Sequence, residues 1–224
     1  NIDKNLDYET RTFAGEVNGV VKKTETPYIG QTFTSEIQKI SKNARIVIPK
    51  LIEFSQNNGL SANGKPFIIY HTYNTATGLA KISICLPTNK EIMTTSGSDI
   101  LGGTLKGFEA VKTTLKGDYS HINDAITKTT AFINKEKITP DLSWSHLEIL
   151  TVSKLDVKSP SKLVTEVYYP VQPKIVPVAK TPVYRTDTEP TYTEPTETDP
   201  AEAPKAAPKP APKPKPTPKP APKT

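Results

Sequence analysis

Two short apolar stretches end in the same way, and they constrain the fold more than any other feature of this chain. The first is Leu79–Pro87 (LAKISICLP) and the second is Leu163–Pro170 (LVTEVYYP). Both are rich in β-branched or other apolar residues and stop at a proline, which is typical of β-strands. The two closing prolines lie 83 residues apart. This spacing predicts a duplicated unit, each copy of which ends in such a strand.

One acid interrupts the second stretch. At the 83-residue offset, Glu166 corresponds to Ser83 in the first stretch. Side chains alternate across a strand, so Glu166 shares a face with Tyr168. An acid among apolar and aromatic neighbours either lies in water at a sheet edge or is buried, and burial raises its pKa until a positive partner binds. We therefore expect one copy of the unit to carry a functional glutamate.

The segments before these two strands repeat one order of predicted elements. In the first half a strand, a helix and two strands cover residues 27–37, 40–52, 67–73 and 79–87. In the second half the same order covers residues 107–115, 122–133, 147–152 and 163–170. Helical spacing of apolar residues indicates the helices, and β-branched and aromatic runs indicate the strands. The pattern predicts an α+β domain of two β-α-β-β units related by a pseudo-twofold axis, with mostly antiparallel strands and the helices packed on one side.

Local signals refine the boundaries of these elements. Pro49 interrupts the first helical pattern, which is compatible either with a kink or with a helix that starts there. Gly59 suits the left-handed position after a helix. Ser120 is the expected N-cap of the second helix, and residues 96–103 are expected to form a loop.

Proline divides the chain into a part that folds and a part that does not. Sixteen of the 22 prolines lie at Pro170 or beyond it. Residues 173–224 are first Pro/Thr/Glu-rich and then Ala/Pro/Lys-rich, with too few apolar side chains to offset chain entropy. We therefore expect a lead-in segment at 1–23, a folded domain at 24–172, and a disordered, semi-rigid tail at 173–224.

The net charge of +6 is unevenly distributed. Residues 187–202 hold six acids and no base, whereas residues 205–223 hold six lysines and no acid. The basic balance therefore gives no indication that this segment binds nucleic acid. We expect the lysine tail to be a solvated spacer, with contact to an acidic polymer or to the cell envelope as the alternative.

Compartment and assembly stay open at this stage. No apolar run reaches the length of a membrane span, and no signal peptide is recognisable. Because the chain begins at Asn1 rather than Met, a cytoplasmic protein and one anchored through a segment upstream of Asn1 both remain possible. Cys85 is the only cysteine, so no internal disulfide can form. The sequence does not determine the oligomeric state.

Two stretches resemble a known family. Gly107–Tyr119 (GFEAVKTTLKGDY) resembles the Gly-Arg-Tyr-Ala…Gly-Pro-Tyr stretch of the bacterial GyrI-like effector-binding domain. Thr165–Val171 (TEVYYPV) resembles the closing Thr-Glu-Ile-Tyr-Ile-Pro-Val strand of that domain. The resemblance covers residues 24–172. It departs at Leu115, where the family usually has a histidine, and these 224 residues show no helix-turn-helix pattern.

The resemblance implies a fold and a site. Proteins of the GyrI-like family have two β-α-β-β units with a small-molecule pocket between them. The same domain is found as the ligand-sensing half of some bacterial transcription regulators. Regulator members bind bulky organic cations with a buried glutamate on the closing strand, and Glu166 matches that position. The predicted ligand-binding residues are Glu166, Tyr168, Tyr70, Phe108, Tyr119, Trp144 and Ser83. Aromatic faces attract organic cations by about 0.5–2 kcal/mol each, although each ring taken singly is also compatible with core packing.

Other kinds of site lack a signal. His71, His121 and His146 show no metal-ligand spacing, and surface or helix-capping roles are expected for them. Cys85 lacks an ordered His/Asp framework and fits a small core residue. No phosphate loop or serine nucleophile elbow is present. We therefore predict no metal and no cofactor.

Three functions compete. The first is a non-enzymatic module that binds an amphiphilic or cationic small molecule, with Glu166 as the counter-charge. The second is a hydrolase of electrophilic compounds, with Glu166 as general base and Tyr168 or Tyr119 as its hydrogen-bond partner. The third is a structural or envelope-associated protein whose Pro/Lys tail reaches a partner. Binding ranks first, because the sequence places no second acid or histidine beside Glu166.

Overall fold

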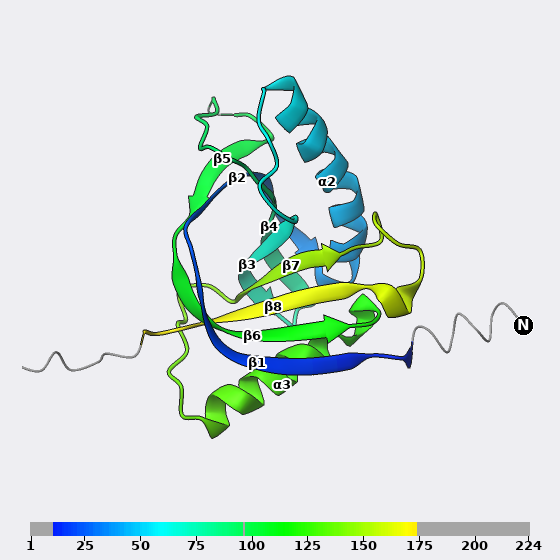
Figure 1. The fold of residues 1–224 in the computed structure, drawn as a ribbon, viewed down its shortest axis with the longest axis vertical. Helices are drawn as coiled ribbons and strands as arrows, with labels where there is room; N and C mark the ends of the chain where they lie inside the picture. Colours follow the sequence, from blue (N-terminus) through cyan, green and yellow to red (C-terminus); the bar gives the residue numbers. More distant parts are fainter. Residues whose placement is uncertain (1–10, 96, 174–224) are drawn as a thin grey trace, which may run out of the picture. The chain divides into compact units, whose positions relative to one another are not determined.

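The computed structural model describes residues 11–95 and 97–173 (Figure 1). Its strands are β1 (Ala14–Lys23), β2 (Thr26–Glu36), β3 (Phe67–Asn74), β4 (Leu79–Pro87), β5 (Leu101–Leu105), β6 (Phe108–Lys116), β7 (His146–Val152) and β8 (Val164–Val171). The helices are α2 (Ile40–Asn57) and α3 (Ile122–Lys135), with short 3-10 turns η1 (Ile37–Lys39), η2 (Tyr119–His121) and η3 (Pro160–Lys162). The predicted tail lies outside the described residues, apart from Pro173. No helix among the described residues is long and apolar enough to cross a membrane.

The described strands form one eight-stranded sheet in the order β1-β6-β8-β7-β3-β4-β2-β5. Every neighbouring pair is antiparallel. The six inner strands are arranged symmetrically about the centre of the sheet, since β6, β8 and β7 of the second half occupy the places of β2, β4 and β3 of the first half. This confirms the predicted α+β class and its antiparallel pairing. The strand order is what a pseudo-twofold axis between β3 and β7 requires, while duplication of the sequence itself stays a prediction.

Strand register relates the two halves in detail. Ser83 on β4 lies opposite Thr32 and Ile69. Glu166 on β8 lies opposite Thr114 and Ile149. Both therefore occupy the middle strand of their three-stranded half, as the 83-residue offset predicts. They share a sheet but not a neighbouring strand, because β7 and β3 lie between β8 and β4.

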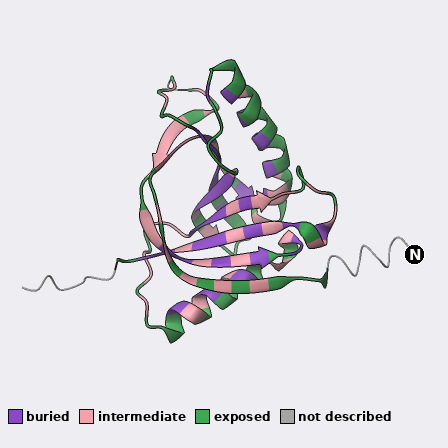
Figure 2. Ribbon diagram, in the orientation of Figure 1, coloured by how far each residue is buried: buried purple, intermediate pink, exposed green. Residues whose placement is uncertain are grey.

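Both helices cover the same face of the sheet, which we call the helix face. The buried side of α2 packs on β3 and β4, and the buried side of α3 packs on β6 and β8. Pro49 lies inside α2 on its exposed side, and the helix continues through it instead of starting there. Figure 2 shows the resulting contrast between buried inner stripes and exposed outer faces of both helices.

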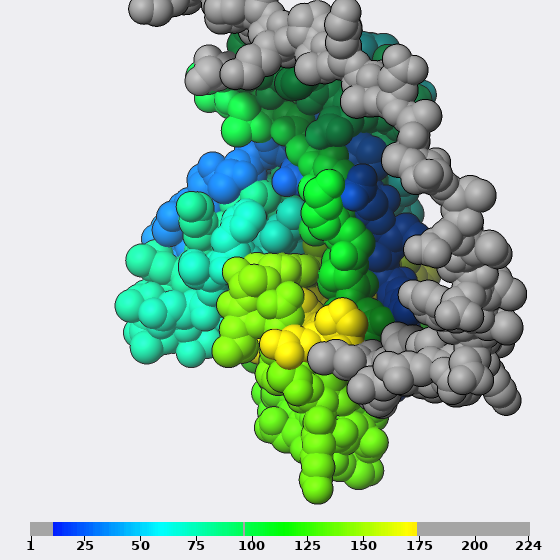
Figure 3. All heavy atoms as spheres, turned by 90° about the vertical axis from the view of Figure 1, so that its left-hand side faces the viewer, coloured from blue at the N-terminus to red at the C-terminus, as the bar shows by residue number. Residues whose placement is uncertain are grey.

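The other face, which we call the inner face, is also apolar. Its buried cluster consists of Phe67, Ile69, Cys85, Ala110, Leu147 and Tyr168. The sheet bends around this cluster, because β1 runs into β2 and β5 runs into β6 through short links. Pairing of Lys23 with Phe108, and of Thr26 with Leu105, keeps the two bent ribbons together. In Figure 3 the green β5–β6 ribbon crosses this side of the molecule with β1, in dark blue, beside it.

One local prediction is confirmed and two are wrong. Gly59 has a φ of +62°, as the helix stop predicted. The last three residues of the loop predicted at 96–103 belong instead to β5 (Leu101–Leu105), because pairing with β2 outweighs their glycine content. Ser120 is not the N-cap: the Asp118 side chain accepts a hydrogen bond from the Ser120 backbone N–H and caps η2. Part of the lead-in segment forms β1, which pairs with β6 along its whole length.

Candidate functional site

A buried carboxylate lies at the centre of the sheet on the helix face. Glu148 is on β7, opposite Ile68 of β3, and only 1% of its surface is exposed. Its Oε2 accepts hydrogen bonds from the hydroxyls of Tyr70 (2.9 Å) and Tyr119 (2.5 Å). Its Oε1 lies 3.3 Å from Nε2 of His146. A carboxylate taken out of water is strongly destabilising unless such groups replace its hydration.

The two tyrosines come from distant parts of the chain. Tyr70 lies on β3 beside Glu148, and Tyr119 is the first residue of η2 at the start of α3. Burial, followed by the charge of Glu148, raises the pKa of both phenols well above the ordinary value. Both hydroxyls therefore stay protonated and remain hydrogen-bond donors at any physiological pH.

The three oxygens form a triangle that is short of one proton. The Tyr70 and Tyr119 hydroxyl oxygens are themselves only 2.7 Å apart. Each phenol has a single proton to donate. When both protons point to Glu148, the contact between the two phenols has no proton in it. The phenol oxygens still have lone pairs that can accept a hydrogen bond from a donor brought to this group.

A histidine closes the cluster on the other side. The His146 ring stacks on Tyr70 with centroids 4.1 Å apart and meets the edge of Tyr73 at 5.2 Å. Its Nδ1 lies 2.9 Å from the Ser145 hydroxyl. The surface or capping role expected for His146 is wrong, since 1% of the residue is exposed. Pairing of β3 with β7 buries it opposite Tyr70.

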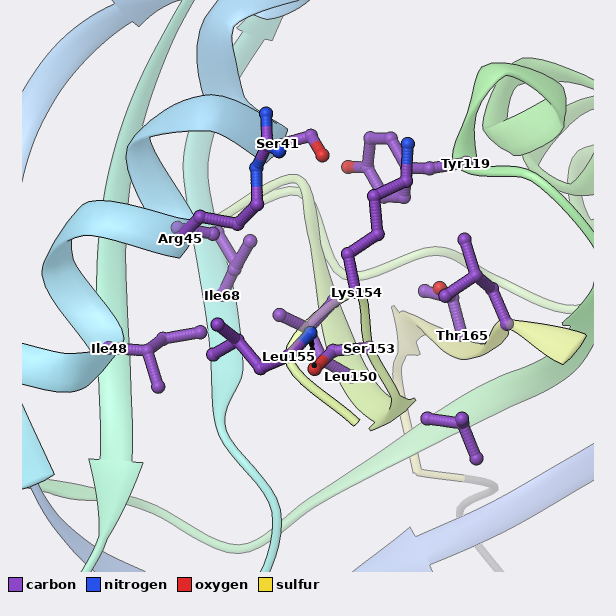
Figure 4. A pocket seen from close by; sticks show the side chains of 13 residues that line it. Ser41, Arg45, Ile48, Ile68, Tyr119, Leu150, Ser153, Lys154, Leu155 and Thr165 are labelled. Carbon is purple, nitrogen blue, oxygen red and sulfur yellow. Dashed lines mark hydrogen bonds between the residues drawn. The ribbon is translucent and has the colours of Figure 1, made fainter. Parts of the chain in front are cut away.

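A pocket opens beside the cluster, between α2 and the β7–β8 connection (Figure 4). Its empty volume is about 490 Å³, counting the space at its open mouth. The apolar walls are Ala44, Ile48, Ile68, Leu150, Val152, Leu155 and Leu163. The polar lining is Ser41, Arg45, Tyr119, Ser153, Lys154 and Thr165. Tyr119 both lines this pocket and donates to Glu148, so it is the direct link between the pocket and the buried acid.

Basic side chains lie at the mouth of the pocket. Nζ of Lys154 is 3.4 Å from Oδ2 of Asp118. Partial burial raises the pKa of Asp118, but hydrogen bonds from Ser120 and the charge of Lys154 outweigh it and hold that pKa below the usual value. Arg45 is exposed on α2 and has no ion pair among the described residues.

Glu166 lies on the inner face, away from this cluster. Its Oε1 is 2.7 Å from Nζ of Lys112, and its Oε2 accepts a 2.7 Å hydrogen bond from Tyr168. The shared face predicted for Glu166 and Tyr168 is therefore confirmed. The expected rise in the pKa of Glu166 is wrong. Burial does raise it, but Lys112 and Tyr168 outweigh burial and the pKa is lowered.

The remaining predicted residues also divide between the two faces. Tyr70 and Tyr119 belong to the helix-face cluster. Ser83, Phe108 and Trp144 belong to the inner face, where the Ser83 hydroxyl contacts Thr32 (2.6 Å) and His71 (2.7 Å). Phe108 and Trp144 meet edge to face with centroids 5.0 Å apart.

The sequence reasoning passed over Glu148 and the partner role of His146. The signal was available, because Glu148 is an acid among apolar residues in the predicted strand 147–152, just as Glu166 is in its own strand. Only the pairing of strands shows that Glu148 belongs to the middle of the sheet.

Comparisons with known proteins identify the fold. No protein-family model matches the sequence, and no curated protein matches it. The structure of EcmrR in an EcmrR–DNA complex is similar with a TM-score of 0.61 at 15% identity, over 76% of this chain and 63% of that one. The isolated EcmrR C-terminal domain has a TM-score of 0.60 at 17% identity, over 71% of this chain and 98% of the domain. An uncharacterized conserved protein from Listeria innocua has a TM-score of 0.51 at 13% identity, over 76% of this chain and 97% of that one.

These similarities concern the fold alone. The chain spans slightly less than two thirds of the EcmrR chain in the DNA complex, and the aligned domain corresponds to nearly all of the EcmrR C-terminal domain. The shared fold is consistent with the effector-binding architecture expected from the sequence resemblance.

Proposed function

We propose that this domain is a small-molecule-binding module of the GyrI-like effector-binding type, and that its ligand enters the helix-face pocket beside Glu148. One observation carries the proposal. The Glu148 carboxylate, which is 1% exposed, accepts a hydrogen bond from Tyr119, and Tyr119 also lines the pocket. Membership of that family is supported by the two sequence stretches and by the fold shared with the EcmrR C-terminal domain.

The energetics of the cluster favour a ligand role for Glu148 over a purely structural one. A buried acid is a poor stabilising element, since apolar side chains of similar volume usually serve the fold as well or better. A carboxylate that is buried beside a pocket is a candidate for function on physical grounds. Glu148 is such a carboxylate, whereas Glu166 already has a lysine as its ion-pair partner. We therefore assign the anchoring glutamate to Glu148 instead of Glu166.

The lining of the pocket indicates the chemistry of the ligand. Apolar walls from α2, β3 and β7 suit a hydrophobic body. The oxygens of Glu148, Tyr70 and Tyr119 gather three hydrogen-bond acceptors at one place, so this group suits a hydrogen-bond donor or a cationic group. The proposed ligand is an amphiphilic organic molecule with an ammonium or similar group. The proposal concerns ligand binding and not DNA binding, because these 224 residues show no helix-turn-helix pattern.

A hydrolase that uses Glu148 instead of Glu166 is the second candidate, because a histidine lies beside Glu148. His146 lies 3.3 Å from Glu148, and Tyr119 connects the pair to the pocket. A glutamate, a histidine and a phenol together can move protons during addition of water to an electrophile. Turnover of an activated ester or epoxide that disappears in Glu148→Gln would favour this candidate over binding alone.

Calorimetric titration with a matched pair of compounds tests the binding proposal. 1-Naphthylmethylammonium and 1-naphthylmethanol have nearly the same shape, and only the first is a cation. Wild type should prefer the cation, and Glu148→Gln should lose that preference at a cost of about 2 kcal/mol, the low end for breaking a buried charge pair, since the pocket is open to solvent.

The matched control is Glu166→Gln, which removes a carboxylate from the inner face. It should leave the affinity for both compounds unchanged. A loss of cation preference in Glu166→Gln but not in Glu148→Gln would refute the assignment of the anchor. No binding of either compound by wild type would count against the helix-face pocket itself.

A further inference from the structure

A second pocket lies on the inner face of the sheet. It is bounded by β2, β3, the β5–β6 link and the connection between α3 and β7, and its empty volume is about 860 Å³ including its mouth. It shares no lining residue with the helix-face pocket. Figure 3 shows the side of the molecule where the green β5–β6 ribbon lies.

Aromatic rings form the walls of this pocket. Phe108 and Trp144 meet edge to face across one side. Tyr28 forms another wall and lies so close to β5 that a Cβ on Gly103 would be 2.8 Å from its ring. Ile69, from the buried inner-face cluster, belongs to the same lining. The glycine therefore allows Tyr28 to lie flat against β5.

Thr104, which lines this pocket, has a hydroxyl without a hydrogen-bond partner among the described residues. Oγ1 of this hydroxyl is buried. An unsatisfied buried hydroxyl is unfavourable, and native proteins leave few of them. The indole N–H of Trp144, the one tryptophan of the chain, also makes no hydrogen bond within the described part. The indole N–H can donate to a bound molecule, and a rotation about χ1 of Thr104, which lines the pocket, would turn its hydroxyl toward that molecule.

The pocket presents no net charge to a ligand. Burial, followed by the charge of Lys81, lowers the pKa of His71, so its ring is neutral at pH 7. Lys106 and Asp141 lie in the lining with opposite signs, and Nζ of Lys106 is 3.3 Å from the Glu25 carboxylate. The site therefore differs from the helix-face pocket, whose polar anchor is an acid.

We propose that the inner-face pocket is a second ligand site, which binds a neutral aromatic molecule carrying one hydrogen-bonding substituent next to Thr104. The ring packs against Tyr28, Phe108 and Trp144, and the substituent bonds the Thr104 hydroxyl. The domain then has two sites of different chemistry on opposite faces of one sheet. This second site does not depend on the function proposed for Glu148.

The fluorescence of Trp144 tests the proposal directly, because the chain has no other tryptophan. The probes are indane, 1-indanol and 1-aminoindane, which share one skeleton and do not absorb at the red edge of tryptophan excitation. Each probe that binds should shift the fluorescence emission of Trp144, and the shift should saturate as the probe concentration is raised. 1-Indanol should bind about threefold to tenfold more tightly than indane, the range expected for one neutral hydrogen bond. The cation 1-aminoindane should bind no more tightly than 1-indanol.

Two variants and a control distinguish a binding role from a structural one. Thr104→Val keeps the shape of the side chain, and should abolish the difference between 1-indanol and indane. Phe108→Ala removes a wall and should weaken both. Phe33→Ala is the control, because Phe33 packs in the helix-face core and should leave both affinities unchanged.

Three results would overturn the proposal. These are an emission of Trp144 that no probe alters, a preference for 1-indanol that survives in Thr104→Val, and tightest binding by 1-aminoindane. If the naphthyl compounds do not bind the helix-face pocket, all three measurements on Trp144 can still be made and interpreted. The two proposals can therefore be refuted separately.

Discussion

Removing one hydroxyl, in Tyr119→Phe, should measurably destabilise the domain. The phenol donates to Oε2 of Glu148, whose exposure is 1%, so water does not replace the lost donor. Hydrogen bonds to charged groups contribute about 1.5–3 kcal/mol, and Tyr70 still donates to the same oxygen. We therefore expect a loss of about 1.5–2 kcal/mol in the free energy of unfolding, from the lower part of that range.

Urea denaturation followed by circular dichroism measures this loss, with Tyr169→Phe as the matched control. Tyr169 is half-buried on β8, and its hydroxyl makes no hydrogen bond to another described residue. The control should stay within about 0.5 kcal/mol of wild type, as is usual for substitutions away from such features.

A double-mutant cycle then isolates the contact itself. In a Glu148→Leu background the carboxylate is absent, so Tyr119→Phe should cost much less than it does in wild type. The expected coupling is about 1–2 kcal/mol, within the range for residues in direct contact. Equal losses in the two backgrounds would refute the account of Glu148 as a carboxylate held by phenol donors.

Two further predictions concern the inner face. Lys112→Met should raise the pKa of Glu166, measured by NMR titration, because Lys112 is its ion-pair partner. A pKa that is lower in the folded state stabilises the fold at pH values above the pKa of the unfolded state, about 4.3 for glutamate, and this contribution is lost as the pH falls through the folded-state pKa. Lys112→Met should therefore lose less stability than wild type when the pH is lowered. An unchanged dependence of stability on acid pH would contradict this. Gly103→Ala should lower the free energy of unfolding by about 1–3 kcal/mol, because the new Cβ would lie 2.8 Å from the Tyr28 ring. Gly15→Ala, whose Cβ would meet only the flexible end of Lys128 at 3.4 Å, is the control for thermal denaturation, and equal losses in the two would show that the Tyr28 contact is unimportant.

Local patterns in the sequence were sufficient for most secondary structure. Alternating apolar and β-branched residues predicted the strands now seen at 67–74, 79–87 and 164–171. Helical spacing predicted both helices, and the two strand ends 83 residues apart predicted a chain whose halves occupy matching places in the sheet. These signals act through neighbours within a few residues, which is why a sequence carries them without any knowledge of the fold.

The identity of the buried acid was decided by tertiary structure. Glu148 and Glu166 each stand among apolar residues in a strand, so alternation alone does not rank them. Pairing of β7 with β3 puts Glu148 next to Tyr70, which is 78 residues away, and η2 brings in Tyr119.

Pairing of β6 with β8 decided the opposite outcome for Glu166. It brings Lys112, 54 residues earlier in the chain, to within 2.7 Å of the carboxylate. Alternation along a strand determines which side chains share a face, whereas the helices and strands that pack on that face determine which of them loses its water. That second step depends on contacts between residues far apart in the chain, and the local pattern contains no record of them.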